Sequence, residues 1–270
     1  MKRRRTLARR LIEDCSNPRG LVVKVLQDTI DHLVGYSYDV DKNGERRLLE
    51  KMELLGPKVI FDVGAHVGDW ALRAAVLHPD AAVHCFELSP STCQTLVTRL
   101  VGPPFIVNEC GMGDHTGDVE FKDYGANVEV NTLLQNATYH DEWLTAVISK
   151  ARITTGDDYC RRHDVAAIDL LKIDVEGADH LVLAGFAERF AANAIRVVQF
   201  EYGYANGDAK FLMRDFYDFF AGFGYAVGRL GPRGVAFAPW NYEMNDFRSG
   251  PNYVAVAADD ADAIRALARF

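Results

Sequence analysis

The chain has 270 residues, of which 49% are hydrophobic and 25% are charged, and its formal net charge is −8 at pH 7. These proportions fit an ordinary globular protein and exclude disordered, collagen-like and disulfide-scaffold chains. The negative charge argues against a nucleic acid partner, because an acidic surface repels the phosphate backbone.

The first residues carry a basic cluster, which runs from Lys2 to Arg10. We interpret it as a solvated terminus, because such runs are common and weakly specific. The pair Leu11-Ile12 leads directly into Glu13-Asp14, so the cluster lacks the apolar stretch of a secretory signal, and no stretch has the length of a transmembrane segment. The five cysteines are odd in number and form no CxxC pair, which favours a reducing compartment. We therefore expect a cytoplasmic protein.

Helical periodicity marks the first part of the chain. It extends from Thr6 to Leu33 with a break at Asn17–Gly20, and a short amphipathic helix is expected at Glu45–Leu55. We assign residues 1–55 to an N-terminal helical extension and residues 56–270 to the main domain.

From residue 56 onward, apolar runs of strand length alternate with helical stretches, as is typical of βα units and a mostly parallel sheet. The expected strands are Val59–Val63, Ala82–Glu87, Phe105–Asn108, Ile168–Ile173 and Ile195–Glu201. The expected helices are Trp70–Leu77, Ser91–Leu100, Asp179–Phe190 and Ala209–Phe220. Three final apolar runs, Tyr225–Leu230, Val235–Ala238 and Tyr253–Ala257, close the sheet.

The pattern changes between residues 117 and 155, and we interpret this segment as an insertion, not as a second domain. Short strands are expected at Val119–Phe121 and Val128–Val130, and a short helix at Asp141–Lys150.

The run FDVGAHVG at Phe61–Gly68 marks the expected cofactor site, because a strand ends in an acid and turns through two glycines into a helix. Glycine lets the backbone approach a ligand, and the helix N-terminus offers free N–H groups, so a nucleotide-like cofactor is implied. Dinucleotide loops have the spacing GxGxxG, whereas here Asp62 precedes Gly64 and the next glycine is Gly68. This DxGxxxG form resembles the loop of class I methyltransferases, which implies S-adenosylmethionine with its methionyl part in the loop.

Glu87 closes the next strand, where a carboxylate can accept both hydroxyls of a ribose; its alternative role is to cap the following helix. The third strand end, from Asn108 to Gly111, is expected beside the adenine. His66 either contacts a ligand or is a solvent-facing turn residue. The positions that we assign to the cofactor are Asp62, Gly64, Ala65, His66, Gly68, Glu87, Leu88, Asn108, Cys110, Gly111 and Asp174.

A second informative run, LLKIDVEGADHLVLAG, occupies Leu170–Gly185. Strand alternation places Lys172, Asp174 and Glu176 on one face. Charged groups at the carboxyl end of a parallel sheet are costly unless they face a ligand crevice, so we expect Asp174, Glu176 and Glu201 to be catalytic. The sequence leaves three roles open: a general base for a hydroxyl, a site for a divalent cation such as Mg²⁺ between Asp174 and Glu201, and, for Asp174 and Glu176, a helix cap.

Together these residues resemble the FkbM family of methyltransferases over Tyr36–Val256. The most specific motifs are VIFDVGAHVGDW, FELSP at Phe86–Pro90, Gly111-Met112-Gly113-Asp114 with Gly117, Thr155-Gly156-Asp157-Asp158, and LLKIDVEGADHLVLAG. The chain departs from the family pattern at His66, Gly156 and His180, where Asn, Leu and Glu are usual.

The resemblance implies a class I, Rossmann-like α/β fold with a mostly parallel seven-stranded sheet and an antiparallel closing hairpin. It also implies methyl transfer from S-adenosylmethionine to an oxygen of a sugar, glycan or small natural product. Three alternatives stay open: an N-methyltransferase acting on a small amine, a nicotinamide dehydrogenase, and a non-catalytic protein that binds the cofactor or assembles with partners. The expected partner is a small-molecule or carbohydrate acceptor, and a homo-oligomer is left open.

Overall fold

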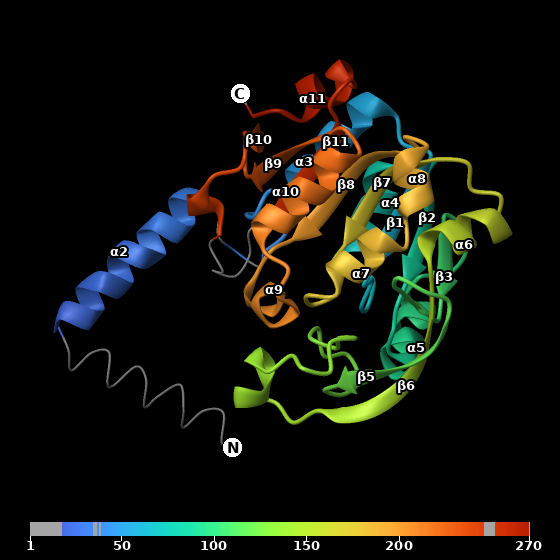
Figure 1. The fold of residues 1–270 in the computed structure, drawn as a ribbon, viewed down its shortest axis with the longest axis horizontal. Coiled ribbons are helices and arrows are strands. Elements are labelled where there is room, and N and C mark those ends of the chain that lie inside the picture. The colour runs from blue at the N-terminus through green and yellow to red at the C-terminus, as the bar shows by residue number, and fades with distance from the viewer. Residues whose placement is uncertain (1–17, 35–36, 38, 246–251, 270) are drawn as a thin grey trace.

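An eight-stranded sheet forms the centre of the molecule (Figure 1). The structure is a computed structural model that describes residues 18–34, 37, 39–245 and 252–269. The strands of this sheet are β1 (Val59–Val63), β2 (Ala82–Phe86), β3 (Phe105–Asn108), β7 (Ile168–Ile173), β8 (Ile195–Glu201), β9 (Tyr225–Gly231), β10 (Gly234–Phe237) and β11 (Asn252–Ala257). Their spatial order is β10-β9-β11-β8-β7-β1-β2-β3.

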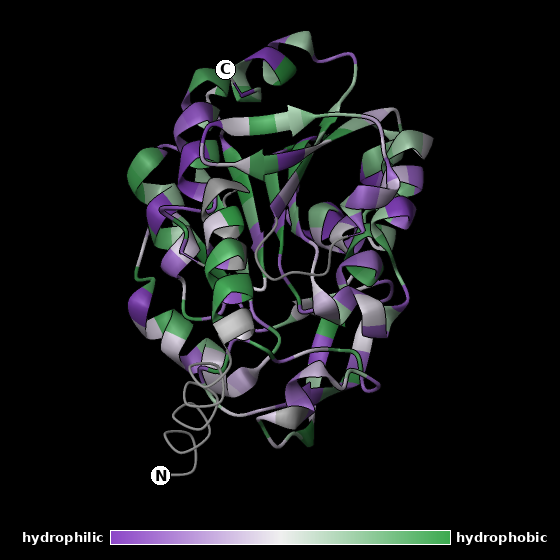
Figure 2. Cartoon of the chain, turned by 90° about the vertical axis from the view of Figure 1, so that its left-hand side faces the viewer, coloured by the Kyte–Doolittle hydropathy of each residue, from purple (hydrophilic) through white to green (hydrophobic). Residues whose placement is uncertain are grey.

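Five neighbouring strands, from β3 to β8, run parallel, and β11 lies antiparallel between β8 and β9. The central strands β1, β7 and β8 are buried along most of their length, as strands covered on both faces must be. Figure 2 shows the hydrophobic residues concentrated in the sheet. The arrangement confirms the expected class I, Rossmann-like fold. The sheet has eight strands instead of seven, because the chain turns back after β9 and adds β10 at the edge.

Helices cover both faces of this sheet. One face packs against α6 (Gly156–Arg162), α7 (Asp179–Ala184), α8 (Ala187–Ala191) and α10 (Met213–Gly222), and the other against α3 (Glu45–Met52), α4 (Asp69–Leu77), α5 (Pro90–Arg99) and α11 (Ala261–Leu267). The face under α6, α7, α8 and α10 holds the first hydrophobic core, and the opposite face holds the second. Side chains alternate along β1, since Phe61 and Val63 enter the first core and Ile60 enters the second. Asp62 therefore faces the side of α4, where its carboxylate is fully buried.

One helix that we expected to be continuous is divided in two, and another begins later than expected. The segment Asp179–Phe190 forms α7 and α8 because the chain leaves the helix at Gly185, where a Cβ would lie 2.1 Å from the carbonyl oxygen of Gly113. The helix expected at Ala209–Phe220 begins only at Met213, as α10. Ala209 is the last residue of α9 (Tyr204–Ala209), and Lys210 follows it in the left-handed region at φ +56°.

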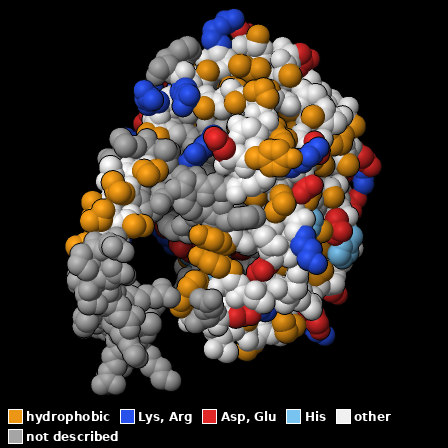
Figure 3. All heavy atoms as spheres, turned by 60° about the vertical axis from the view of Figure 1, so that its left-hand side comes forward, with side chains coloured by type: hydrophobic (Ala, Val, Ile, Leu, Met, Phe, Trp, Pro, Cys, Tyr) orange, Lys and Arg blue, Asp and Glu red, His pale blue; other side chains and the backbone are white. Residues whose placement is uncertain are grey.

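The N-terminal residues contribute two helices with different surroundings. Helix α3, followed by the 3-10 turn η1 (Glu53–Leu55), buries Leu48, Leu49 and Met52 in the second core, so it packs against the main domain. Helix α2 (Pro18–Val34) extends away from the sheet (Figure 1). Six of its apolar side chains are between 44% and 64% exposed, and Figure 3 shows hydrophobic side chains along this helix; the six are Leu21, Val22, Val23, Val25, Leu26 and Ile30. Residues 6–17 of the expected first helix lie outside the described residues. None of the described helices combines the length and the apolar character needed to cross a bilayer.

The insertion supplies β5 (Gly117–Asp123) and β6 (Val147–Thr154), which join β4 (Gly111–Met112) in a second, three-stranded sheet of order β4-β6-β5. Two expectations for this segment are wrong. Val128–Val130 is not a strand but part of a turning loop, in which Asn127 has φ +58° and the side chain of Asn131 accepts the N–H of Tyr124. The helix expected at Asp141–Lys150 is only the 3-10 turn η2 (Tyr139–Glu142), because pairing with β5 draws the residues from Val147 onward into β6.

Candidate active site

The turn after β1 brings the backbone close to two other strands. The N–H groups of Gly64 and Ala65 donate to the carbonyl oxygen of Phe86 at 3.0 and 2.9 Å. Gly64 has φ +81°, and a Cβ there would stand 1.8 Å from the carbonyl oxygen of Asp174 on the neighbouring β7 side. Only glycine fits this close approach. Gly68 ends the turn as the N-cap residue of α4.

Glu87 follows β2 and is only 6% exposed. Its Oε2 accepts the N–H of His66 at 2.9 Å, and its Oε1 accepts the N–H of Ser89 at 2.8 Å. Burial raises the pKa of this carboxyl, although the two N–H groups oppose the shift by stabilising the charged form. The N-cap residue of α5 is Ser89, whose side chain accepts the N–H of Thr92, so the helix does not need Glu87 as its cap.

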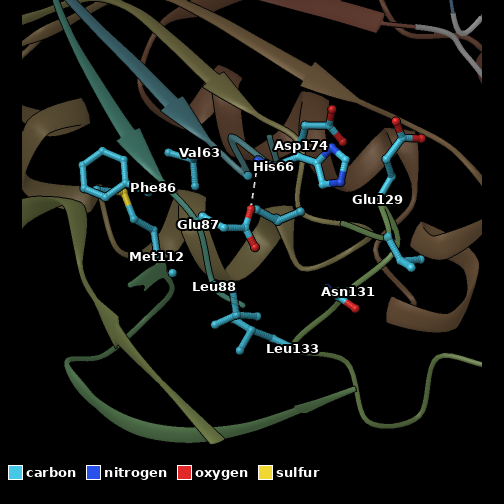
Figure 4. Close-up of a pocket in the computed structure, with 14 residues that line it drawn as sticks. Val63, His66, Phe86, Glu87, Leu88, Met112, Glu129, Asn131, Leu133 and Asp174 are labelled. Carbon is cyan, nitrogen blue, oxygen red and sulfur yellow. Dashed lines mark hydrogen bonds between the residues drawn. The ribbon is translucent and has the colours of Figure 1, made fainter. Parts of the chain in front are cut away.

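A cavity lies at the ends of β1 and β2 (Figure 4). Six of the predicted cofactor positions line it: Gly64, His66, Glu87, Leu88, Gly111 and Asp174. The insertion supplies the facing wall with Val128, Glu129, Asn131 and Leu133. In Figure 4, the carboxylate of Glu87 reaches the backbone of the glycine turn from below. The ring Nε2 of His66 is buried and has no hydrogen-bond partner among the described residues.

Four other predicted cofactor positions, Asp62, Gly68, Asn108 and Cys110, line neither this cavity nor the larger cleft beside it. The amide of Asn108 donates instead to the carbonyl oxygens of Cys85 and Ile106, both at 3.1 Å. Cys110 packs against the first core. The side chains at the end of β3 are therefore used within the protein, whereas Gly111 reaches the cavity.

A buried ion pair network lies under the glycine turn. Asp62 and Lys172 are direct neighbours across β1 and β7, and Nζ of Lys172 lies 3.1 Å from Asp62 and 3.3 Å from Asp174. The ammonium group also lies 5.7 Å from the centre of the Trp70 ring. Burial by itself lowers the pKa of Lys172, but the charges of the neighbouring carboxylates outweigh it and raise that pKa above its usual range. Lys172 thus remains charged and holds Asp174 at the edge of the cavity.

A larger cleft opens beside the cavity. Four residues line both spaces and so join them: Gly64, His66, Glu129 and Asp174. All three predicted catalytic carboxylates, Asp174, Glu176 and Glu201, line the cleft. Burial, followed by the negative charges of Asp174 and Glu176, raises the pKa of Glu201 well above its usual range. The sequence prediction that these groups share one crevice agrees with this placement.

Glu176 lies in a turn after β7, not on the strand as alternation predicted. Its φ of +55° is in the left-handed region, which is uncommon for a residue other than glycine. Its Oε2 lies 3.3 Å from Nε2 of His140, which the insertion brings into the cleft. Burial raises the pKa of Glu176, and the hydrogen bond to His140 opposes the shift. The N-cap residue of α7 is Ala178, without a side-chain cap, so neither Asp174 nor Glu176 serves as one.

Two residues of the cleft, His140 and Asp179, were not predicted from the sequence. His140 stands in a segment without a recognisable motif, 36 residues before Glu176. Asp179 was expected only as the first residue of a helix, and its 2% exposure depends on how α7 packs. No local signal in the sequence marks either residue.

The described residues contain no group of three or more His, Cys, Asp and Glu side chains arranged to hold a metal ion. Between Asp62 and Asp174, the ammonium of Lys172 occupies the position that a cation would take. The donor set does not fit the divalent cation that we considered between Asp174 and Glu201.

The three departures from the family pattern each have a local explanation. His66 has φ +49°, a conformation that histidine adopts more readily than most residues. At Gly156, a Cβ would stand 2.1 Å from the ring of Phe186, so the aromatic side chain fills the space of a larger residue. His180 stacks on the ring of Phe211 at 5.2 Å between centroids.

Comparisons with known proteins find relatives of this chain. A curated relative, the 31-O-demethyl-FK506 methyltransferase FkbM of Streptomyces tacrolimicus, is 30% identical over 159 residues, which cover 50% of this chain and 61% of that protein. The chain therefore spans about three fifths of the curated relative that it matches.

Two solved structures are also similar. The methyltransferase FkbM from Methylobacillus flagellatus KT is 15% identical with a TM-score of 0.48, and the match covers 74% of this chain and 43% of that one. The O-methyltransferase TomG from Streptomyces achromogenes, which is involved in tomaymycin synthesis and was crystallised with S-adenosylmethionine, is 14% identical with a TM-score of 0.44 and 79% coverage of both chains. Residues 62–227, well over half of the chain, match the family model described as the methyltransferase FkbM domain, and the chain therefore belongs to this methyltransferase family.

Proposed function

We propose that this chain transfers a methyl group from S-adenosylmethionine to a hydroxyl of a small-molecule or carbohydrate acceptor. The observation that supports this most is the junction of the two spaces, since Gly64, His66, Glu129 and Asp174 line both the cavity and the cleft. A donor held in the cavity and an acceptor held in the cleft would meet at these four residues.

The cavity has the chemistry that a nucleoside requires. Glu87 is fixed by two backbone N–H groups and keeps further lone pairs for ribose hydroxyls. Leu88, Met112 and Leu133 give the apolar walls that suit a base. His66 Nε2, unpartnered among the described residues, is available to the methionyl part. When bound, S-adenosylmethionine supplies an electrophilic methyl group. We propose Gly64, Ala65, His66, Glu87, Leu88 and Gly111 as its contacts, supported from behind by Asp62, Gly68, Asn108 and Cys110.

The chain's own residues then position the acceptor and remove its proton. Asp174 lies at the junction and is held by Lys172, which suits it as the general base for the acceptor hydroxyl. Glu176 and Glu201 line the cleft but not the cavity, and they would orient the acceptor. Most of the rate should come from this positioning, with a smaller share from proton removal. No step requires a metal ion at these residues.

A cytoplasmic location is part of the proposal. It is supported by Cys85, Cys93, Cys110 and Cys160, which are free thiols in the structure.

The direct test is a screen with methyl-labelled S-adenosylmethionine against glycosides, sugar nucleotides, glycan extracts and small amines, with magnesium or with a chelator. We expect label in an alkali-stable methyl ether, with transfer continuing in the presence of chelator. Label only on nitrogen would identify an N-methyltransferase. Binding of S-adenosylhomocysteine without transfer to any acceptor would identify a non-catalytic protein.

A further inference from the structure

The acceptor side of the cleft is strongly acidic. Its lining includes the carboxylates of Glu45, Asp69, Glu129, Asp174, Glu176, Asp179 and Glu201. The basic side chains among its lining residues are Lys172, His66 and His140. Lys172 already pairs with Asp62 and Asp174, and His140 lies against Glu176. Asp69 pairs with Arg99, which lies outside the lining. The lining still holds more carboxyl groups than cationic side chains, so it favours a cation over a phosphate.

Two buried polar groups in the lining point to a ligand independently of this charge. Asp179 and Asn206 are each only 2% exposed. Oδ1 of Asp179 and Nδ2 of Asn206 have no hydrogen-bond partner among the described residues. A buried polar atom without a partner is unfavourable, so these two atoms favour a ligand that offers the complementary groups.

Two stacked tyrosines form an aromatic part of the cleft lining. Tyr139 from the insertion stacks on Tyr204 from α9, with 4.7 Å between ring centroids and 13° between ring planes. Both residues line the cleft. Aromatic faces pack well against the C–H face of a sugar ring and attract cations.

We infer that the acceptor is an amine-bearing polyol, such as an aminosugar or an aminocyclitol, whose ammonium group is held by Asp179 and Glu201 while a hydroxyl of the same molecule receives the methyl group. The inference rests on the proposed function. Asn206 would donate to another hydroxyl of this acceptor, and the tyrosine pair would cover its ring.

The chemistry of the transfer is consistent with a bound ammonium. The protonated nitrogen has no lone pair and is not methylated. The hydroxyl oxygen forms a bond to the methyl carbon as the carbon–sulfur bond breaks, and the hydroxyl proton passes to Asp174. The sulfonium charge is lost in this step, because the bond electrons remain on sulfur as a neutral thioether.

A bound ammonium should also change the protonation of Asp179. Burial, with the nearby charge of Asp174, raises the pKa of Asp179 to about 8. At pH 7 this carboxyl is therefore largely protonated in the free protein. An ammonium beside it favours the charged form, so binding should release a proton.

The test is calorimetry on the full chain saturated with S-adenosylhomocysteine. The probes are the methyl glycoside of glucosamine, its N-acetyl derivative and glucose 1-phosphate. We expect the amine to bind at least tenfold more tightly than the N-acetyl derivative, with a heat that changes with the ionisation enthalpy of the buffer, and no signal from the phosphate.

Variants test whether Asp179 is the origin of this preference. Asp179→Asn should reduce the preference for the amine at least fivefold. Glu201→Gln should cause a similar reduction, and it provides the test if Asp179→Asn does not fold. Asp118→Asn removes an equal charge from β5, where the side chain is 85% exposed, and should change nothing. Equal or weaker binding of the amine by the wild type, or binding of neither glycoside, overturns the inference while the proposed function stands. Failure to bind S-adenosylhomocysteine would instead refute the proposed function.

Discussion

The cavity proposed for the cofactor (the cofactor side) and the cleft proposed for the acceptor (the acceptor side) are held in place by different means. On the cofactor side, backbone groups fix the geometry: Gly64 packs against a carbonyl, and Glu87 accepts two N–H groups. On the acceptor side, side chains from separate segments meet, as in the pair of Glu176 and His140, and several carboxylates raise one another's pKa. Substitutions on the first side should therefore affect folding and cofactor affinity, and those on the second should affect turnover and pH dependence.

The largest effect should come from Asp174→Asn, because Asp174 stands where the two sides meet. If it is the general base, turnover should fall by roughly 10²- to 10⁴-fold. Affinity for S-adenosylhomocysteine should change little, since asparagine keeps the size and the polar oxygen of the side chain beside Lys172. Full turnover would remove Asp174 from the mechanism, and Asp118→Asn on exposed β5 provides the control of equal charge change.

Gly64→Ala tests whether close backbone packing fixes the geometry of the cofactor side. A methyl group 1.8 Å from a carbonyl oxygen forces β1 and β7 apart, and the residue has φ +81°. We expect the free energy of unfolding to fall by about 3 kcal/mol or more, with loss of cofactor binding. Denaturant unfolding measures the first and calorimetry the second.

Gly56→Ala is the matched control for this variant. Gly56 also has positive φ, +59°, but a Cβ there would meet nothing within 4 Å. Gly56→Ala should lower the free energy of unfolding by about 1 kcal/mol, because backbone strain is its only cost. Equal costs at Gly56 and Gly64 would contradict the close approach of the two strands.

Glu87→Gln should weaken binding of S-adenosylhomocysteine by about 2 kcal/mol, roughly thirtyfold, because charge-assisted hydrogen bonds to the ribose are lost. Asp169→Asn is its control. Asp169 likewise accepts two backbone N–H groups, from Lys58 and Val59 at 2.7 and 2.9 Å, but at the other end of the sheet. Asp169→Asn should lower the free energy of unfolding and leave the affinity for S-adenosylhomocysteine unchanged in calorimetry. An equal loss of affinity in both variants would remove Glu87 from the ribose site.

The acceptor side predicts a pH dependence of stability. The pKa of Asp179 is about 8 in the folded protein, against a usual 3.8. Between these values the folded chain holds a proton that the unfolded chain has released, so the free energy of unfolding falls as pH rises from about 4 to 8. The slope from this residue is at most about 1.4 kcal/mol per pH unit. Asp179→Asn should remove it in denaturant unfolding between pH 5 and 9, and an unchanged slope would contradict the buried, protonated carboxyl.

The smallest effect on stability should come from Glu176→Gly. Glycine adopts φ +55° without strain, so the free energy of unfolding should rise by about 1 kcal/mol while turnover falls. Asp164→Gly replaces an exposed residue with the same φ of +55° and should stabilise the protein by a similar amount at full activity. A stabilised Glu176→Gly variant with normal turnover would show that the strained carboxylate is not part of the site.

The difference between local signals and contacts made only on folding explains which features could be predicted from the sequence. The strands β1, β3, β7 and β8 have the expected boundaries, because a continuous apolar run between turns is a local signal. Glu87 was found for the same reason, since it directly follows such a run. The strand β6 was missed because it exists through pairing with β5, and the division at Gly185 depends on a contact with Gly113. His140 and Asp179 acquire their surroundings only when the insertion and α7 pack over the sheet.

The most direct test of the central claim is a calorimetric titration of the wild-type chain with S-adenosylhomocysteine and, separately, with NADH. A cavity with one fixed ribose-binding carboxylate and no dinucleotide loop should give saturable one-to-one binding of S-adenosylhomocysteine and no heat with NADH. Binding of NADH alone, or of neither ligand, would contradict the assignment of this cavity to the methyl donor.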